Sequence, residues 1–284
     1  MGGPAMQAYQ PSRTAMGAAL HRAAHQILDS PPVFADPLAL RIVGQAAEQA
    51  MRDGRDTRVA QSALRAFIAV RSRLAEDLLA GAYRRGVRQY VLLGAGLDTF
   101  GYRNDHADLR VFEVDQPASQ SRKRAMLAAV GVCVPGSLTF AAVDFERETL
   151  TDGLARAGFD LAAPAQFAML GVSMYLTASA VAGTLSFVAG RPAGTQIVFD
   201  YATPRESLGA AQRAAAEALG ERVTAAGEPF SAAFAPDYMR ELLAGLGFTR
   251  ITDFDAAALN ARYFADRDDG LALSGGAHIA SAGV

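Results

Sequence analysis

Five short apolar runs recur between residues 89 and 200, and segments of helical character separate them. The runs predict buried strands at residues 89–94, 109–114, 138–143, 166–171 and 195–200. Because strands that alternate with helices form parallel sheets, the pattern predicts an α/β fold with a doubly wound, mostly parallel sheet. Ligands of such sheets bind in a crevice at the carboxyl ends of the strands. Functional residues are therefore expected just after each run.

The first run ends in a glycine-rich turn, Gly94–Gly96. Glycine at positions 94 and 96 lets the backbone turn tightly and lie close to a ligand. The second run ends in Asp115, at the spacing of about twenty residues that is usual for a carboxylate bound to a ribose diol. Glu113 is the near alternative. The turn and the acid together predict an adenosine site, and the other interpretation is a tight turn without a ligand.

The motif departs from those that bind pyrophosphate. Thr99-Phe100-Gly101 does not supply the third glycine of a dinucleotide fingerprint, and no Gly-Lys-Ser/Thr of a P-loop follows. An adenosine ligand without a pyrophosphate fits better, and S-adenosyl-L-methionine is the commonest such ligand. A nicotinamide-dependent dehydrogenase is disfavoured for the same reason.

Further short segments extend the pattern in a fixed order along nearly the whole chain. They are Phe34–Pro37, Arg71–Arg73, Arg88–Thr99, Tyr102-Arg103, Phe112–Pro117 with Lys123, Val143–Phe145, Leu170–Thr177, Phe199–Ala202, Gly227–Phe230 and Arg262–Phe264. Together they resemble the leucine carboxyl methyltransferase family, and its bacterial branch in particular. These matches in a fixed order are together far more specific than any one of them.

The resemblance implies a Rossmann-like class I methyltransferase fold with a seven-stranded sheet and S-adenosyl-L-methionine as the cofactor. We expect one domain over residues 1–284. It would comprise a helical N-terminal cover (1–85), a cofactor-binding core (86–202), a helical insertion or lid (203–235) and closing strands (236–284). The last part includes Gly247-Phe248 and Leu271–Leu273, which resemble the closing antiparallel strand pair of that fold.

The resemblance also implies which residues contact the cofactor. Asp115 would bind the ribose, Asp144 the adenine, and Arg71 the methionine carboxylate. The full set of expected cofactor-binding residues is Arg22, Arg71, Gly94, Ala95, Gly96, Asp115, Gln116, Asp144, Phe145, Leu170 and Gly171. Leu170 is a departure, because the eukaryotic members carry glutamate there. From the residues alone, Asp144 could instead be a helix N-cap, and Arg71 could grip a carboxylate of the substrate.

Tyr175 and Arg71 are the candidate catalytic residues. Tyr175 follows the fourth strand, where a methyl acceptor would lie, and Tyr201 follows the fifth; either could orient an acceptor oxygen or merely pack. His25 in the N-terminal cover is a less favoured candidate. The four histidines show no metal-binding spacing, so no metal is expected.

The resemblance implies an O-methyltransferase that forms a methyl ester on the carboxylate of a small molecule, such as a secondary metabolite. A carboxylate is ionised at neutral pH and needs no general base. A hydroxyl or phenol acceptor, which would need one, is the first alternative. A non-catalytic adenosine-binding protein is the second.

Composition excludes several other classes. The net charge is −2 with no basic block, so we expect no nucleic-acid partner. A single cysteine, Cys133, and an N-terminus without a signal-like apolar core favour the cytoplasm. Residues 161–190 carry no charge, but polar interruptions and an N-cap at Thr177 predict a strand, a loop and a helix rather than a membrane span. The oligomeric state stays open.

Overall fold

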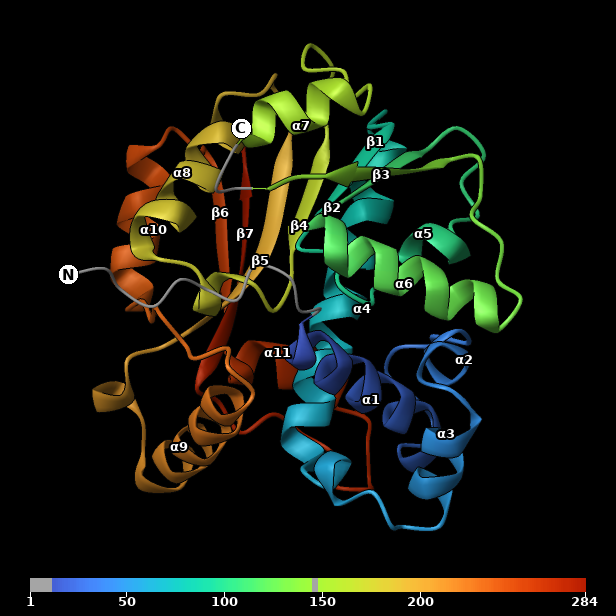
Figure 1. Ribbon diagram of the computed structural model, residues 1–284. Helices are drawn as coiled ribbons and strands as arrows, with labels where there is room; N and C mark the ends of the chain where they lie inside the picture. The colour runs from blue at the N-terminus through green and yellow to red at the C-terminus, as the bar shows by residue number, and fades with distance from the viewer. Residues whose placement is uncertain (1–11, 145–147) are drawn as a thin grey trace, which may run out of the picture.

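The computed structural model describes residues 12–144 and 148–284. A seven-stranded sheet has the order β3-β2-β1-β4-β5-β7-β6, and helices cover both of its faces (Figure 1). The strands are β1 (Gln89–Leu93), β2 (Arg110–Asp115), β3 (Leu138–Ala142), β4 (Gln166–Met169), β5 (Gln196–Ala202), β6 (Arg250–Phe254) and β7 (Ala277–Gly283). The seven-stranded α/β fold predicted for this chain is confirmed.

The helices alternate with the strands through the central part of the chain. They are α1 (Arg13–Leu28), α2 (Ala39–Val43), α3 (Gln45–Arg52), α4 (Ser62–Arg84), α5 (Phe100–Arg103), α6 (Pro117–Ala129), α7 (Leu150–Arg156), α8 (Ala178–Ala189), α9 (Ala210–Ala225), α10 (Pro236–Gly245) and α11 (Ala256–Tyr263). Three short 3-10 turns are η1 (Thr57–Val59), η2 (Ser173–Tyr175) and η3 (Arg205–Ser207).

The strand order creates one switch point. Strands β1 to β5 are parallel, and β1 pairs with β2 on one side and with β4 on the other. The connections therefore reverse direction at β1, so the ligand crevice expected for such sheets lies between the carboxyl ends of β1 and β4. Strand β7 runs antiparallel between β5 and β6. Gly94 and Gly171 follow β1 and β4, so both lie at the crevice.

Alternating side chains of the strands feed two cores, one on each face of the sheet. Val91, Phe112 and Phe167 pack with α7, α8 and α10 on one face. Tyr90 and Val111 pack with α4 and α11 on the other. Because the central strands are buried on both faces, they read as continuous apolar runs, which is why the sequence marks them clearly.

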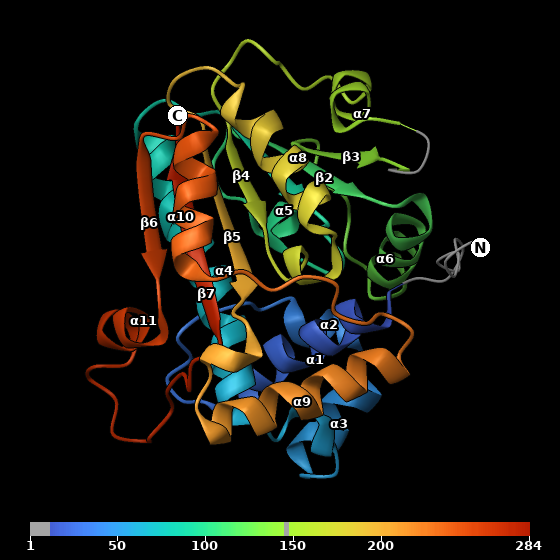
Figure 2. The same ribbon diagram turned by 90° about the vertical axis from the view of Figure 1, so that its left-hand side faces the viewer.

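The N-terminal helices and α9 gather at the carboxyl end of the parallel strands. Figures 1 and 2 show α1, α3 and α9 at this end, with α1 beside α4. Helix α1 begins after Ser12, whose Oγ accepts a hydrogen bond from the backbone nitrogen of Ala15 at 3.0 Å. The cover and the insertion thus meet over the crevice.

Local structure departs from the sequence prediction at the closing strands. The prediction of a closing strand at Leu271–Leu273 is wrong: these residues lie outside any strand, and both leucines pack into the core on the α4 face. Asp36 and Pro37 precede α2, which begins at Ala39. The Asp36 carboxylate binds other segments, as described below.

The uncharged stretch 161–190 folds as expected. It forms β4, η2 and α8, and the Thr177 side chain caps α8 by accepting a hydrogen bond from the backbone nitrogen of Ala180. Over the ranges that the structure describes, no helix has the length and apolar character needed to cross a membrane.

Candidate active site

The turn after β1 requires glycine. Gly94 has φ = 68° and Gly96 has φ = 47°, a left-handed conformation that L side chains rarely adopt. A Cβ at Gly94 would also lie 2.5 Å from Cγ2 of Val172. The backbone nitrogens of Gly94 and Ala95 both donate to the carbonyl of Val114, at 2.8 and 3.1 Å, so the turn is tied to the end of β2.

Asp115 closes this turn from the neighbouring strand. Its Oδ2 accepts from the backbone nitrogen of Gly96 at 2.6 Å, and its Oδ1 accepts from that of Gln116 at 2.7 Å. Burial raises the pKa of Asp115, and the two backbone hydrogen bonds oppose that shift. The alternative acid, Glu113, is fully buried and forms an ion pair with Lys123 at 2.7 Å, away from the crevice.

A second polar group lies at the other side of the crevice, after β4. The backbone nitrogen of Gly171 donates to Oδ1 of Asp200 at 2.6 Å, and Nη1 of Arg71 donates to Oδ2 at 3.0 Å. A Cβ at Gly171 would lie 2.7 Å from this Nη1. Asp200 is fully buried and was not among the predicted site residues. Its only sequence signal is the Phe199–Ala202 segment, which carried no predicted role.

Arg22 reaches the turn from α1. Its Nη2 donates to the carbonyl of Leu97 at 2.5 Å, and its Nε donates to Oδ2 of Asp36 at 3.0 Å. The same Asp36 oxygen accepts from Oγ1 of Thr99 at 2.7 Å. Arg22 and Asp36 therefore hold α1 against the segment that follows the glycine turn. Arg73, by contrast, is exposed and pairs with Asp77.

Tyr175 lies in η2, close to the Arg71 side of the crevice. Its ring packs against Phe230 with centroids 5.3 Å apart. Burial raises the pKa of the Tyr175 phenol, and hydrogen bonding to Thr14 and the charge of Arg71 oppose the shift. The phenol is thus protonated at neutral pH and sits where the N-terminal cover, the crevice and the insertion meet.

Glu228 joins the insertion to the start of α1, and we call this contact the Glu228 clasp. Oε1 of Glu228 accepts from the backbone nitrogen of Arg13 at 2.6 Å. Oε2 accepts from the hydroxyls of Ser12 and Thr14, at 2.8 and 2.5 Å. A carboxylate is favoured here by the unpaired N–H groups and the dipole of a helix N-terminus. No role was predicted for Glu228, because the contact joins residues more than two hundred positions apart.

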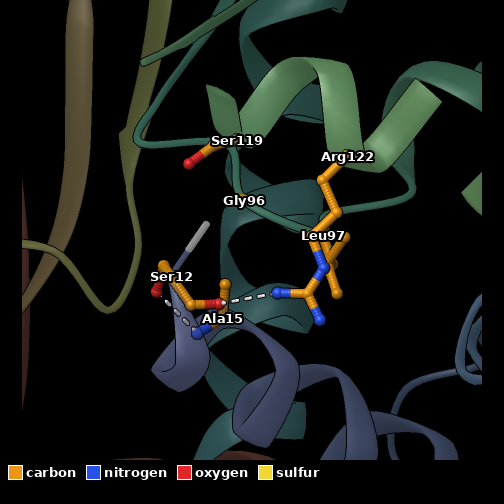
Figure 3. A pocket seen from close by; sticks show the side chains of 6 residues that line it. All are labelled: Ser12, Ala15, Gly96, Leu97, Ser119 and Arg122. Carbon is orange, nitrogen blue, oxygen red and sulfur yellow. Dashed lines mark hydrogen bonds between the residues drawn. The ribbon is translucent and has the colours of Figure 1, made fainter. Parts of the chain in front are cut away.

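A small pocket lies at the start of α1. Figure 3 shows it beside the glycine turn, between the start of α1 and helix α6; it is lined by Ser12, Ala15, Gly96, Leu97, Ser119 and Arg122. Nη1 of Arg122 donates to the carbonyl of Ser12 at 3.5 Å. Ser119 also hydrogen-bonds Asp115. The pocket therefore adjoins the carboxylate predicted to bind a ribose.

The remaining predicted cofactor residues lie at strand ends. Asp144 follows β3, and Glu148 accepts from its backbone nitrogen at 3.1 Å. The alternative that Asp144 caps a helix is wrong, because α7 begins later with Thr149 as its N-cap. Leu170 is partly buried and packs on the α4 side of the sheet. Phe145 lies outside the described residues.

Two other candidates point away from the crevice. His25 is fully buried; its Nδ1 lies 2.8 Å from Oδ2 of Asp29, and its Nε2 accepts from the backbone nitrogens of Val33 and Phe34. Tyr201 donates its hydroxyl to Asp253 on β6. Both side chains thus stabilise the fold. Among the residues with described positions, no cluster of three or more histidine, cysteine, aspartate or glutamate side chains could hold a metal ion.

Known proteins resemble this chain in sequence and in fold. The model of the leucine carboxyl methyltransferase family matches residues 15–189. A Bacillus subtilis protein, named provisionally as an S-adenosyl-L-methionine-dependent methyltransferase, is 31% identical over 94% of this chain and 95% of its own length. A Mycolicibacterium paratuberculosis protein with a similarly provisional name is 35% identical over 52% of this chain and 49% of its own.

Solved structures share the fold. A crystal structure described as a provisional methyltransferase from Thermobifida fusca has a TM-score of 0.56 at 17% identity, covering 99% of this chain and 97% of that one. A DUF574 protein from Streptomyces avermitilis has a TM-score of 0.52 at 15% identity, with coverage of 96% and 97%. The whole-length sequence match and the family model lead to one assignment. The chain belongs to the leucine carboxyl methyltransferase family.

Proposed function

We propose that this protein, an S-adenosyl-L-methionine-dependent methyltransferase, forms a methyl ester on the carboxylate of a small molecule. The observation that carries the proposal is that two charged groups, each next to a glycine turn, lie at the switch point of the sheet. Asp115 borders the Gly94 turn, and the Arg71–Asp200 pair borders Gly171. A ligand with a ribose diol at one end and an amino acid at the other fits an acceptor carboxylate on one side and a donor guanidinium on the other.

The residues present suit the cofactor. Asp115 accepts hydrogen bonds from two backbone nitrogens and from Ser119, so about one of the four acceptor sites of its carboxylate is free for a ribose hydroxyl. The second ribose hydroxyl would take the place of Ser119. A guanidinium carries five N–H donors, so Arg71 can donate to the methionine carboxylate while it keeps Asp200. When bound, the cofactor supplies an electrophilic methyl group on a sulfonium.

The protein then has to position the acceptor and exclude water. A carboxylate is already nucleophilic at neutral pH, so alignment and desolvation are the main requirements. Tyr175, kept protonated by its raised pKa, would donate a hydrogen bond that orients the acceptor. The Glu228 clasp would keep the cover closed over the crevice. Family membership supports the carboxylate preference.

Binding of the cofactor is tested first by calorimetric titration with S-adenosyl-L-homocysteine. Asp115→Ala should weaken binding about tenfold or more, since charge-assisted hydrogen bonds to the ribose are lost. Asp105→Asn is the matched control, because that carboxylate is 91% exposed. Equal binding by wild type and Asp115→Ala would contradict the placement of the ribose.

The acceptor class is tested with methyl-labelled S-adenosyl-L-methionine and a panel of carboxylic acids, each paired with its alcohol or phenol. Alkali hydrolyses a methyl ester and releases labelled methanol, whereas a methyl ether survives. Alkali-labile products from the acids support the proposal. Alkali-stable products alone would favour the hydroxyl-directed alternative, and cofactor binding without turnover on any acceptor would favour a binding protein.

A further inference from the structure

One ring nitrogen of a buried histidine on α1 has no hydrogen-bond partner among the described residues. His21 is 6% exposed, and its Nδ1 makes no hydrogen bond within the described part of the chain. Buried polar atoms are nearly always hydrogen-bonded, so an unpaired ring nitrogen needs an explanation. His25, one turn further on, shows the ordinary outcome, since both of its ring nitrogens have partners.

His21 lies among groups of the proposed acceptor site. Thr14 and Gly17 precede it on the same side of α1, at helical spacings of seven and four residues. Thr14 hydrogen-bonds Tyr175 and Glu228. A Cβ built on Gly17 would meet nothing within 4 Å, so there is open space one turn from the imidazole. The imidazole therefore lies one helical turn from open space, on the side of α1 where Thr14 contacts Tyr175 and Glu228.

The charges that face His21 are mainly positive. Burial first, and then Arg222 on α9 and Arg65 and Arg71 on α4, lower its pKa to about 4, while Asp56 opposes them. The imidazole is therefore neutral at physiological pH. A neutral imidazole among arginines can donate an N–H to an anion.

The three arginines differ in how their charge is balanced. Arg65 binds both oxygens of Asp29, and Arg71 binds Asp200. Arg222 is exposed, and its Nη2 donates to the neutral amide oxygen of Gln61 at 2.7 Å. Among the described residues no carboxylate forms an ion pair with Arg222. Its charge is thus available to a ligand that enters between α1 and α9.

We infer that His21 and Arg222 form a subsite that binds a carboxylate of the methyl acceptor, with His21 at the buried end and Arg222 at the solvent end. This inference rests on the proposed function and adds the residues that select the acceptor. Arg222 contributes charge from the insertion, so the acceptor is held by both the cover and the lid. The imidazole N–H orients the carboxylate through a directional hydrogen bond. Neutral molecules of the same shape would bind less well.

The test uses benzoate as the probe, because Tyr175, whose ring packs against Phe230, hydrogen-bonds Thr14 on the same side of α1 as His21. Benzoate and its neutral isostere benzamide are titrated into protein saturated with S-adenosyl-L-homocysteine. The ring nitrogens of His21 are followed by nitrogen-15 NMR, assigned with His21→Leu. Benzoate should shift these resonances and raise the pKa of His21, because a bound anion favours the imidazolium. Benzamide should do neither.

Variants separate charge from shape. Arg222→Gln and His21→Leu should each weaken benzoate binding about tenfold or more, while His21→Gln, which keeps a neutral N–H donor, should retain most of it. Arg213→Gln is the matched control: Arg213 is an exposed arginine on the same helix that donates to the carbonyl of Leu208. It should bind benzoate like the wild type.

The inference is overturned if wild-type protein does not bind benzoate, if benzamide binds equally, or if Arg222→Gln and Arg213→Gln behave alike. Binding of S-adenosyl-L-homocysteine is recorded for every variant. If every variant binds S-adenosyl-L-homocysteine and all of them methylate carboxylic acids equally well, the subsite is wrong and the proposed function stands. If benzoate binds as expected but no acid is ever methylated, the proposed function fails instead.

Discussion

Replacing Gly171 with alanine should damage the crevice through Arg71. Gly171 has φ = 70°, and an added Cβ would lie 2.7 Å from Nη1, 2.8 Å from Nη2 and 3.0 Å from Cζ of the Arg71 guanidinium. The guanidinium is the end of a flexible side chain, so it can move away. Moving it, however, separates it from Asp200, whose carboxylate is fully buried.

The size of the effect follows from two contributions. Alanine in a left-handed conformation costs about 1–2 kcal/mol. Depriving a buried carboxylate of its arginine costs roughly 3 kcal/mol more, the lower end for broken buried ion pairs, because Asp200 keeps its hydrogen bond from Gly171. We expect the free energy of unfolding of Gly171→Ala to fall by about 4–5 kcal/mol in total.

Gly131→Ala isolates the backbone contribution. Gly131 has nearly the same conformation, φ = 68°, and a Cβ built there meets nothing within 4 Å. Its substitution should cost only about 1–2 kcal/mol. Urea unfolding followed by circular dichroism gives both values, and titration with S-adenosyl-L-homocysteine should show weakened binding in Gly171→Ala alone.

Equal losses of stability in the two variants would refute the reasoning. That result would mean that the guanidinium can move without leaving Asp200. A large loss of stability with unchanged cofactor binding would instead support the role of the ion pair in stability and show that Arg71 does not bind the cofactor.

Three further predictions concern other contacts. Glu228→Gln should speed dissociation of S-adenosyl-L-homocysteine about tenfold in stopped-flow experiments, because the charge-assisted bonds to the start of α1 and to Thr14 are weakened; an unchanged rate would mean that the clasp does not gate the site. The pKa of His21 falls from 6.5 to about 4 on folding, so the unfolded state binds more protons between these pH values. The free energy of unfolding should therefore fall by up to about 3 kcal/mol as the pH drops from 6.5 to 4. Urea unfolding of His21→Gln should show a smaller fall over this pH range, and the same fall as in the wild type would contradict a lowered pKa of His21. Glu113→Gln should cost about 3–5 kcal/mol by leaving the Lys123 ammonium buried without its ion pair, and adding Lys123→Met should recover most of that loss in urea unfolding.

The parts of the fold that local pattern determines could be predicted from the sequence. Five parallel strands were recognisable because strands buried on both faces are continuously apolar. The Thr177 cap and the glycine turn after β1 were recognisable because capping and positive φ depend on neighbouring residues. The resemblance to one family supplied the presence of a closing antiparallel pair but not its position, because the last strand lies at Ala277–Gly283 and not at Leu271–Leu273.

Contacts between distant segments could not be predicted in this way. Asp200 and Tyr201 are adjacent, but side chains of a strand alternate between its faces, so Asp200 meets Arg71 while Tyr201 meets Asp253 on the other face. Tyr201 was a candidate for orienting the acceptor, but its position in the strand directs its side chain away from the crevice. The Glu228 clasp depends on how the insertion folds back onto α1, and no residue pattern records that.

The buried pair of Glu113 and Lys123 has a practical consequence for chemical labelling. Lys123 is the only lysine in the sequence, and only 1% of its side chain is exposed. Acylating reagents that modify ε-amines will therefore find no accessible lysine on the folded protein. Modification of Lys123 would occur only when α6 separates from β2, so its rate, measured by mass spectrometry, would report opening of that part of the molecule without any introduced probe.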